Sequence, residues 1–205
     1  MTDSVVVAVP AGRLARWLDN FGERHGETVL RVHDGALRGE AVDGSRFVAR
    51  LPFAQRYDGP AAAADLAAAA RPPERWGVLL VRKGGFAVAR LAGPELVEHK
   101  IGQRHVQGRT KAGGQSQQRF ARRRDNQARM AYEAAADHAA RILAGRPLVV
   151  VTGGDHAAVD EVLTDPRLRH VEVTAPWLAV PDPRRAVLDA AVSDAAALRV
   201  EVTNA

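Results

Sequence analysis

The chain has 205 residues, no cysteine, 46% hydrophobic residues and a formal net charge of +5. This length and hydrophobic content allow a buried core in one large or two small domains. The lack of cysteine excludes disulfides and thiolate chemistry and fits a reducing compartment. Residues 1–12 have no basic region and only a short apolar run, and no later run approaches spanning length. We therefore expect a cytoplasmic protein without a signal peptide or membrane association.

The sequence pattern of residues 1–58 predicts a small α+β unit. A strand is expected over residues 4–9. A helix is expected over about 12–25, where Leu14, Trp17, Leu18 and Phe21 recur at helical spacing. Asp-Gly pairs are typical of tight turns, and two of them separate three expected short strands over 28–32, 36–42 and 46–51. No catalytic constellation is visible in this unit.

Residues 59–74 predict a linker. The run at 61–70 is almost entirely alanine and lies between Pro60 and Pro72. Alanine is the strongest helix former, and proline stops a helix on either side. We expect a short helix within the linker, with a disordered linker as the alternative.

Residues 75–205 predict a second, α/β domain with a mixed sheet. Strands are expected over 76–81, 86–91 and 96–101, followed by a basic loop over about 102–116. A long helix over about 117–143 precedes a continuous apolar strand of the parallel type at 147–152. A helix ending at Leu163, a strand at 168–174 and a helix at 183–198 complete the domain. The tail to Ala205 either pairs as a last strand or frays.

The most basic part of the chain is the stretch 99–129. It contains nine Lys or Arg and one acid, a net +8, which leaves −3 for all other residues. A local field of this kind is typical of proteins that bind a polyanion. The candidate RNA-binding residues are Lys100, Arg104, Arg109, Lys111, Arg119, Arg122, Arg123 and Arg124.

The long helix carries two different patterns. Ala128, Tyr132, Ala135, Ala139 and Ile142 step at helical spacing and predict one continuous stripe packed against the sheet. The first third instead carries four arginines on more than one face, with one acid nearby. A solvated face is the ordinary interpretation of helix charge. The shortage of acids favours phosphate contact, for which arginine offers bidentate geometry.

Gly113-Gly114-Gln115 lies at the centre of the basic stretch. Two residues without Cβ atoms let the backbone take positive φ and approach a ligand closely. The backbone N–H of Gln115 can then face developing negative charge. Its side-chain amide both donates and accepts hydrogen bonds but does not ionise, which suits orienting or excluding water. A flexible loop without chemistry is the alternative interpretation of the triplet alone.

The triplet does not stand alone. Gly113-Gly114-Gln115-Ser116, then Arg119-Phe120-Ala121-Arg122 and Arg124, closely resembles the pattern G-G-Q-S-x-x-R-F-A-R-x-R of eukaryotic and archaeal class-one peptide-release factors. The same catalytic domain occurs in the Vms-type (VLRF) release factors of ribosome quality control, which include actinobacterial members. The resemblance extends more loosely from about residue 75 to 197. It implies an RNase H-like domain that hydrolyses peptidyl-tRNA in the peptidyl-transferase centre.

Two departures refine what the resemblance implies. The chain has no room for the decoding domain of termination factors, so we expect codon-independent rescue on stalled ribosomes or separated large subunits. Vms-type proteins vary around the triplet, and Gln117 and Gln118 follow closely here. Gln115, with Gly113 and Gly114, is the expected catalytic group, and Gln117 is the reserve. The expected partners are large-subunit ribosomal RNA and peptidyl-tRNA.

Other chemistries lack their motifs in this sequence. His99 and His105 have no zinc-helix spacing, no serine lies in a G-x-S-x-G elbow, and the basic region has no paired carboxylates. We therefore expect an enzyme without a metal or organic cofactor. We also expect a monomer. A non-catalytic ribosome-binding factor and a tRNA-binding module acting off the ribosome remain the alternatives.

Overall fold

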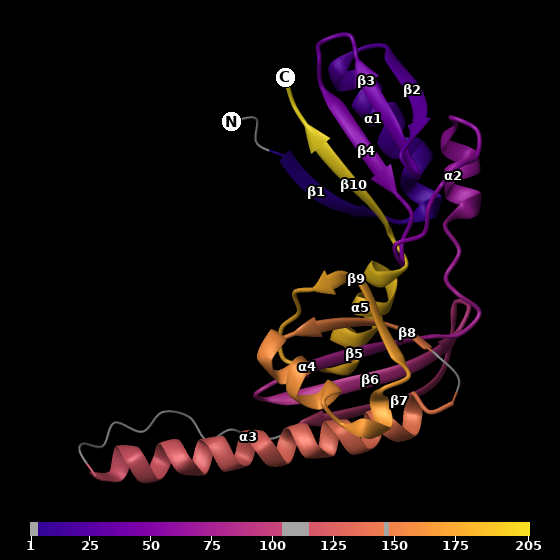
Figure 1. Cartoon of the computed structure of the whole chain (residues 1–205). Coiled ribbons are helices and arrows are strands. Elements are labelled where there is room, and N and C mark those ends of the chain that lie inside the picture. Colours follow the sequence, from indigo (N-terminus) through magenta and orange to yellow (C-terminus); the bar gives the residue numbers. More distant parts are fainter. Residues whose placement is uncertain (1–3, 104–114, 146–147) are drawn as a thin grey trace. The chain divides into compact units, whose positions relative to one another are not determined.

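The computed structural model describes residues 4–103, 115–145 and 148–205, and for residues 103 and 115–128 it describes the backbone alone. The chain forms two compact units (Figure 1). Unit 1 comprises Met1–Pro72 together with Ser193–Ala205, and unit 2 comprises Pro73–Val192. Unit 2 is therefore an insertion in the sequence of unit 1.

Unit 1 is built on an antiparallel sheet, here called sheet A, whose strand order is β1-β10-β4-β3-β2. Its strands are β1 (Ser4–Val9), β2 (Thr28–His33), β3 (Ala36–Ala41), β4 (Arg46–Arg50) and β10 (Leu198–Thr203). The first four lie within two residues of the expected ranges. The left-handed backbone at Asp34 and Gly35, with φ of 52° and 68°, forms the tight turn that joins β2 to β3.

Helices cover one face of sheet A. A short 3₁₀ turn (Ala11–Arg13) leads into α1 (Leu14–His25), which confirms the expected helix. Trp17 and Phe21 of α1 pack edge-on against Phe47 of β4, with ring centroids 5.2 and 5.1 Å apart. Such aromatic contacts, together with buried Leu14 and Leu37, make the core of this unit.

Two expectations for this unit are wrong. The alanine-rich run forms α2 (Ala63–Ala69), but Leu66 is fully buried in the core beside α1, so the helix belongs to unit 1 rather than to a linker. Residues 75–205 are also not one unit, because β10 inserts between β1 and β4. The cause is the alternation of apolar and polar residues along β10. Its apolar residues Leu198 and Val200 are buried in the core of unit 1, which places the strand in sheet A.

Unit 2 is built on a mixed sheet, here called sheet B, whose strand order is β7-β6-β5-β8-β9. The strands are β5 (Trp76–Arg82), β6 (Gly85–Ala92), β7 (Glu95–Gln103), β8 (Leu148–Gly154) and β9 (Val171–Leu178). The first three form an antiparallel meander, and β8 and β9 run parallel to β5. A meander followed by two strands added in parallel beside its first strand is the arrangement of an RNase H-like sheet, which confirms the expected fold class.

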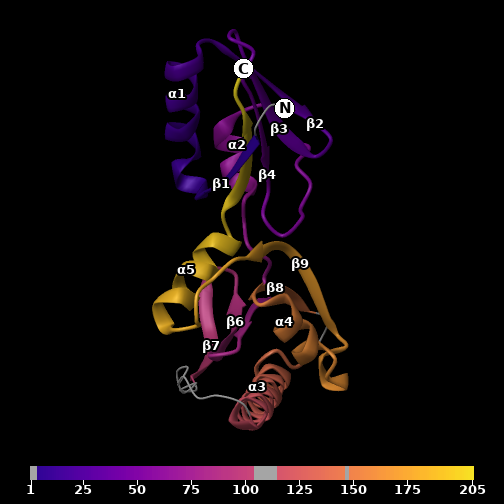
Figure 2. The ribbon, with the colours of Figure 1, turned by 90° about the vertical axis from the view of Figure 1, so that its left-hand side faces the viewer.

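Three helices complete unit 2: α3 (Gln115–Ile142), α4 (His156–Leu163) and α5 (Arg185–Ala195). Figure 2 views α3 nearly end-on, with α4 beside it on one side of the sheet and α5 on the other. Ala135, Ala139 and Ile142 are buried against the sheet, which confirms the described part of the expected stripe. No helix within the described ranges is long and apolar enough to cross a membrane.

Strand β9 begins three residues later than expected and continues to Leu178. The reason is a short 3₁₀ turn, η2 (Pro166–Leu168), in the place where the strand was expected to start. Asp165 caps this turn by accepting a hydrogen bond from the backbone N–H of Arg167, and Pro166 supplies a first position that needs no donor.

Candidate functional site

Part of the candidate catalytic segment lies outside the residues that the structure describes. Strand β7 ends at Gln103 and α3 begins at Gln115. Gly113, Gly114, Arg104, Arg109 and Lys111 lie between them, outside the described residues. Gln117, Arg119, Arg122, Arg123 and Arg124 belong to the first part of α3, where only the backbone is described. Lys100 of β7 is the one candidate whose side chain is described, and it is exposed.

Gln115 is the first residue of α3 rather than part of the preceding loop, so the helix begins two residues earlier than expected. The first N–H groups of a helix have no acceptor within the helix. They also carry the positive end of the helix dipole. The backbone N–H of Gln115 is thus among the groups that have no acceptor within the helix. Such an N–H can donate a hydrogen bond to an oxygen on which negative charge develops.

Helix α3 is far longer than its contact with the sheet. It has 28 residues, which corresponds to about 42 Å. Among the described side chains, burial begins at Ala131, while Arg129 and Met130 are exposed. Figure 1 shows the first half of α3 extending past the edge of sheet B. The candidate glutamines and the four candidate arginines of α3 are therefore carried on the part of the helix that projects.

Three cationic or imidazole side chains hold the opposite end of α3. Arg90 donates from Nε to the carbonyl oxygen of Ile142 at 3.1 Å, and His170 donates from Nε2 to that of Leu143 at 2.8 Å. Arg75 donates to the carbonyl oxygen of Ala144 at 3.4 Å. The last carbonyls of a helix have no partner within it, and cations there complement the dipole. We call these three side chains the carboxyl-end anchor.

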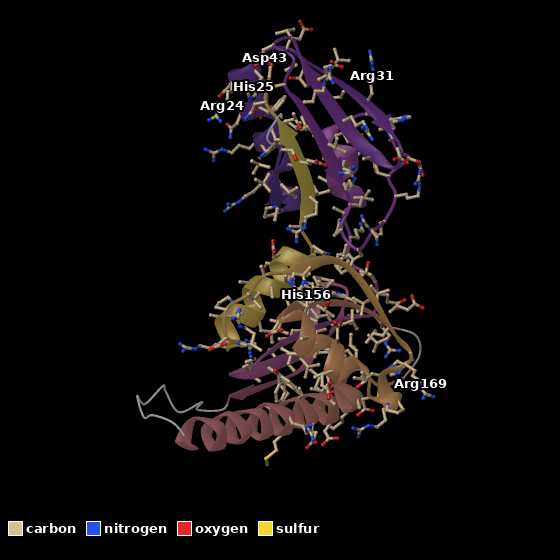
Figure 3. The ribbon with its side chains drawn as sticks, turned by 60° about the vertical axis from the view of Figure 1, so that its left-hand side comes forward. Arg24, His25, Arg31, Asp43, His156 and Arg169 are labelled. Atoms are coloured by element: carbon tan, nitrogen blue, oxygen red, sulfur yellow. The ribbon has the colours of Figure 1, made fainter. Side chains whose placement is uncertain are left out.

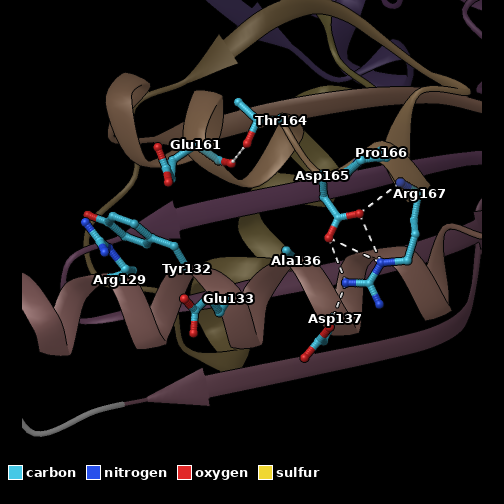
Figure 4. Close-up of a pocket in the computed structure, with 10 residues that line it drawn as sticks. All are labelled: Arg129, Tyr132, Glu133, Ala136, Asp137, Glu161, Thr164, Asp165, Pro166 and Arg167. Atoms are coloured by element: carbon cyan, nitrogen blue, oxygen red, sulfur yellow. Dashed lines mark hydrogen bonds and ion pairs between the residues drawn. The ribbon is translucent and has the colours of Figure 1, made fainter.

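Two ion-pair groups brace α3 from the sides. Arg167 of η2 donates to Asp137 of α3 at 2.6 Å and to Asp165 at 2.7 Å (Figure 4). The side-chain hydrogen bonds from Arg167 lower the pKa of Asp165 to about 2, and the same contacts raise the pKa of Arg167. On the other side, hydrogen bonds from Arg141 and then Arg90 lower the pKa of Glu98.

A cleft of about 640 Å³ lies between α3 and the turn after α4 (Figure 4). Its lining residues are Arg129, Tyr132, Glu133, Ala136, Asp137, Glu161, Thr164, Asp165, Pro166 and Arg167. Four of these are carboxylates and two are arginines, of which Arg167 is already paired. A phosphate would meet repulsion here, so this side of α3 does not suit RNA contact.

A smaller cleft of about 260 Å³ lies on the β7 side of α3, where Lys100 is found. It is lined by Gly85, Phe86, Lys100, Gly102, Met130, Ala131, Ala134 and His138. Lys100 thus lies beside the part of α3 where the helix begins to pack on the sheet. A Cβ on Gly102 would come within 2.2 Å of the Phe86 ring, so glycine keeps β7 close to β6 here.

Sequence reasoning missed the groups that position α3. Arg90, His170 and Arg75 are separated from their helix partners by 52, 27 and 69 positions respectively. Nothing in a local pattern connects residues so far apart.

Comparison with known proteins adds one positive finding. No curated protein matches the chain. A protein family described as Actinobacteria/chloroflexi VLRF1 release factor matches residues 74–201, well over half of the sequence. The matched range contains the whole of sheet B, the long helix and most of β10. The chain therefore belongs to the Actinobacteria/chloroflexi VLRF1 release factor family.

Proposed function

We propose that this release-factor-family protein is a cytoplasmic, monomeric peptidyl-tRNA hydrolase that frees nascent peptides without reading a codon. Its substrates are peptidyl-tRNAs on stalled ribosomes or separated large subunits. The observation that supports this most is the position of Gly113-Gly114-Gln115: the glutamine begins a helix whose far end is anchored in an RNase H-like sheet. The arginines that follow lie on the same projecting segment.

The reaction is hydrolysis of the ester between the peptide and the terminal ribose of the tRNA. Water attacks the ester carbonyl carbon, and the carbonyl oxygen becomes negatively charged. In the proposal the backbone N–H of Gln115 donates to this oxyanion, because the first N–H of the helix has no internal acceptor. The bond between the carbonyl carbon and the ribose oxygen then breaks, the ribose oxygen takes up the proton lost by the attacking water and becomes a hydroxyl, and the peptide leaves as a carboxylic acid.

The side chains have separate roles in this proposal. The amide of Gln115 orients the attacking water, with Gln117 as the alternative glutamine. Gly113 and Gly114 let the backbone approach the ester in a narrow site walled by RNA. Lys100, Arg104, Arg109, Lys111, Arg119, Arg122, Arg123 and Arg124 neutralise phosphates of ribosomal RNA and tRNA. The proposed step uses no metal or organic cofactor.

The test is single-turnover release of a labelled peptide from purified peptidyl-tRNA–large-subunit complexes. Wild-type protein is expected to release the peptide with kinetics that saturate with protein concentration, and Gly114→Ala to bind the complexes without releasing it. If wild-type protein binds the complexes but releases nothing, the hydrolase proposal is wrong. The non-catalytic ribosome- or tRNA-binding factor is then the correct interpretation.

A further inference from the structure

The uncovered face of sheet A in unit 1 carries arginines from four adjacent strands. Successive residues of a strand point to opposite faces. Leu30, Leu37 and Phe47 contact the core, so their strand neighbours lie on the face that α1 and α2 do not cover. Figure 3 shows Arg31 extending away from β2. The arginines of this face, here called the arginine face, are Arg31, Arg38, Arg46, Arg50 and Arg199.

The strand register places two pairs of these arginines directly opposite each other. Arg31 faces Arg38 across β2 and β3, and Arg199 faces Arg50 across β10 and β4. Like charges at directly opposed positions destabilise a sheet. Within the described part of the chain, neither Arg31 nor Arg38 has a carboxylate partner. Arg199 and Arg50 each do have one, at 3.3 and 3.4 Å, so the repulsion left uncompensated is that between Arg31 and Arg38.

Composition does not account for the excess of positive charge on this face. Unit 1 contains ten Arg and eleven acids, a net −1. The strand residues of the arginine face nonetheless include five Arg and only two acids, Glu40 and Glu201. Each of the two acids pairs with one arginine of β4, at 2.9 and 3.4 Å, and Arg199 pairs with Asp194 of α5 at 3.3 Å. The acids of the unit are thus concentrated elsewhere, and an anionic partner would relieve the repulsion.

The side chains of this face also indicate which anion it suits. Trp17, Phe21 and Phe47 are on the core side, and no strand residue of the arginine face is Phe, Tyr or Trp. Without aromatic rings the face offers no stacking platform for unpaired bases and no aromatic anchor for a protein partner. Guanidinium groups do offer bidentate geometry to phosphate.

We propose that the arginine face binds the phosphate backbone of double-stranded RNA and recognises no bases. The choice of RNA over other polyanions rests on the proposed function, which brings the protein to ribosomal RNA. Unit 1 then contributes a second RNA contact, separate in sequence from the basic stretch at 99–129.

The test is binding of the full chain to a short RNA duplex of arbitrary sequence across a salt series. The variant Arg31→Gln/Arg38→Gln removes the two arginines of this face that have no described carboxylate partner, and Arg16→Gln/Arg24→Gln makes the same charge change on α1. The first variant is expected to bind about tenfold more weakly, with a salt slope reduced by about two, because each lost phosphate contact removes about 0.9 from the slope. The control is expected to bind as wild type, and the melting temperature of the first variant to stay equal or rise.

Three results would overturn this proposal. The first is unchanged affinity of Arg31→Gln/Arg38→Gln for the RNA duplex, and the second is an equal loss of affinity in the Arg16→Gln/Arg24→Gln control. The third is an equal loss of affinity when polyglutamate replaces the duplex, which indicates an acidic protein partner. The peptide-release assay on the same samples separates this idea from the proposed function. Normal duplex binding by Arg31→Gln/Arg38→Gln, with active release by wild type, refutes the arginine face alone. Weak duplex binding by that variant, with no release by wild type, refutes the hydrolase alone.

Discussion

Arg90 of β6 donates a hydrogen bond to the carbonyl oxygen of Ile142, 52 positions later in the chain, at 3.1 Å. The same side chain contacts Glu98 of β7 at 3.5 Å, and Glu98 also pairs with Arg141. One arginine thus connects two strands of sheet B with the carboxyl end of α3. This contact is one of those by which the sheet holds the helix that begins with Gln115.

Replacing Arg90 with Met is expected to lower the free energy of unfolding by about 1–3 kcal/mol, because it leaves a helix-end carbonyl without its donor. Amide exchange at the carboxyl end of α3 is expected to quicken, as measured by hydrogen exchange alongside urea unfolding. Arg46→Met is the matched control, since it breaks an exposed pair of the kind that contributes little. Equal destabilisation by the two variants contradicts the anchoring role of Arg90.

Replacing Gly114 with Ala is expected to abolish peptide release while preserving ribosome binding, because the added Cβ obstructs the approach of the backbone to the ester. Gln115→Ala keeps the backbone N–H and is expected to slow release, where losing an oriented donor typically costs about a hundredfold or more. The control is Gly12→Ala, where an added Cβ would meet no atom within 4 Å.

Single-turnover release and a binding assay on the same samples measure these effects. Release at the wild-type rate by both Gly114→Ala and Gln115→Ala is incompatible with the proposed chemistry. If Gln117→Ala alone is inactive, the proposed reaction is still correct, and the catalytic glutamine is Gln117 rather than Gln115.

Replacing Arg119, Arg122, Arg123 and Arg124 with Ala is expected to weaken ribosome association and flatten its salt dependence, through loss of phosphate neutralisation and counterion release. Co-sedimentation across a salt series is the measurement. A charge-matched control replaces four exposed arginines of unit 1, namely Arg13, Arg16, Arg24 and Arg71. Identical salt slopes for wild type and the α3 variant would remove the basis for this RNA contact.

The Asp165–Arg167 contact is expected to make stability depend on acid pH. Hydrogen bonds from Arg167 lower the pKa of Asp165 from 3.8 to about 2 in the folded protein. A carboxyl whose folded pKa is lowered stabilises the fold above its unfolded pKa, and this stabilisation is lost as pH falls from about 4 to about 2. Asp165→Asn is therefore expected to be less stable at neutral pH and to show a shallower loss of stability over this window.

Urea unfolding at a series of pH values measures this effect. Asp160→Asn is the control, because Asp160 is an exposed carboxylate on α4 that forms no ion pair with another described residue. Parallel stability curves for wild type and Asp165→Asn between pH 2 and 4 would show that the contact does not form in solution.

Replacing Leu66 with Ala is expected to destabilise the protein by about 2–5 kcal/mol, the usual cost of a cavity at a fully buried leucine. The prediction distinguishes a packed α2 from a linker helix, for which the same change would have little effect. Thermal and urea unfolding are the measurements. Val42→Ala is the control because Val42 is 76% exposed. If Leu66→Ala destabilises the protein no more than Val42→Ala does, α2 is a linker helix and is not packed in the core.

Local patterns predicted most of the strands and helices. The apolar run before Gly153 predicted a buried parallel strand, and β8 does run parallel to β5. The stripe through Ala135, Ala139 and Ile142 predicted the face of α3 that meets the sheet. These predictions succeed because periodicity and apolar runs record burial directly.

Long-range relationships were beyond the reach of such patterns. The alternation in 198–203 allowed a strand, but nothing local indicated that β1 and β4 would be its neighbours. Leu66 is the one large apolar residue in an alanine run, and only its burial reveals that α2 is packed. At the site, glycines before Gln115 and good helix formers after it explain why α3 starts there. The roles of Gly113 and Gly114 stay predictions.

The insertion of β10 between β1 and β4 affects the order in which the protein can form during its own synthesis. Domains generally fold in the order in which they emerge from the ribosome. Sheet A departs from that order, because β1 pairs with β10, and β10 is translated only after all of sheet B. Until residues 198–203 have left the exit tunnel, β1 lacks its partner strand and one edge of β4 stays open. Unit 2 can therefore fold first, and the amino-terminal unit is completed last.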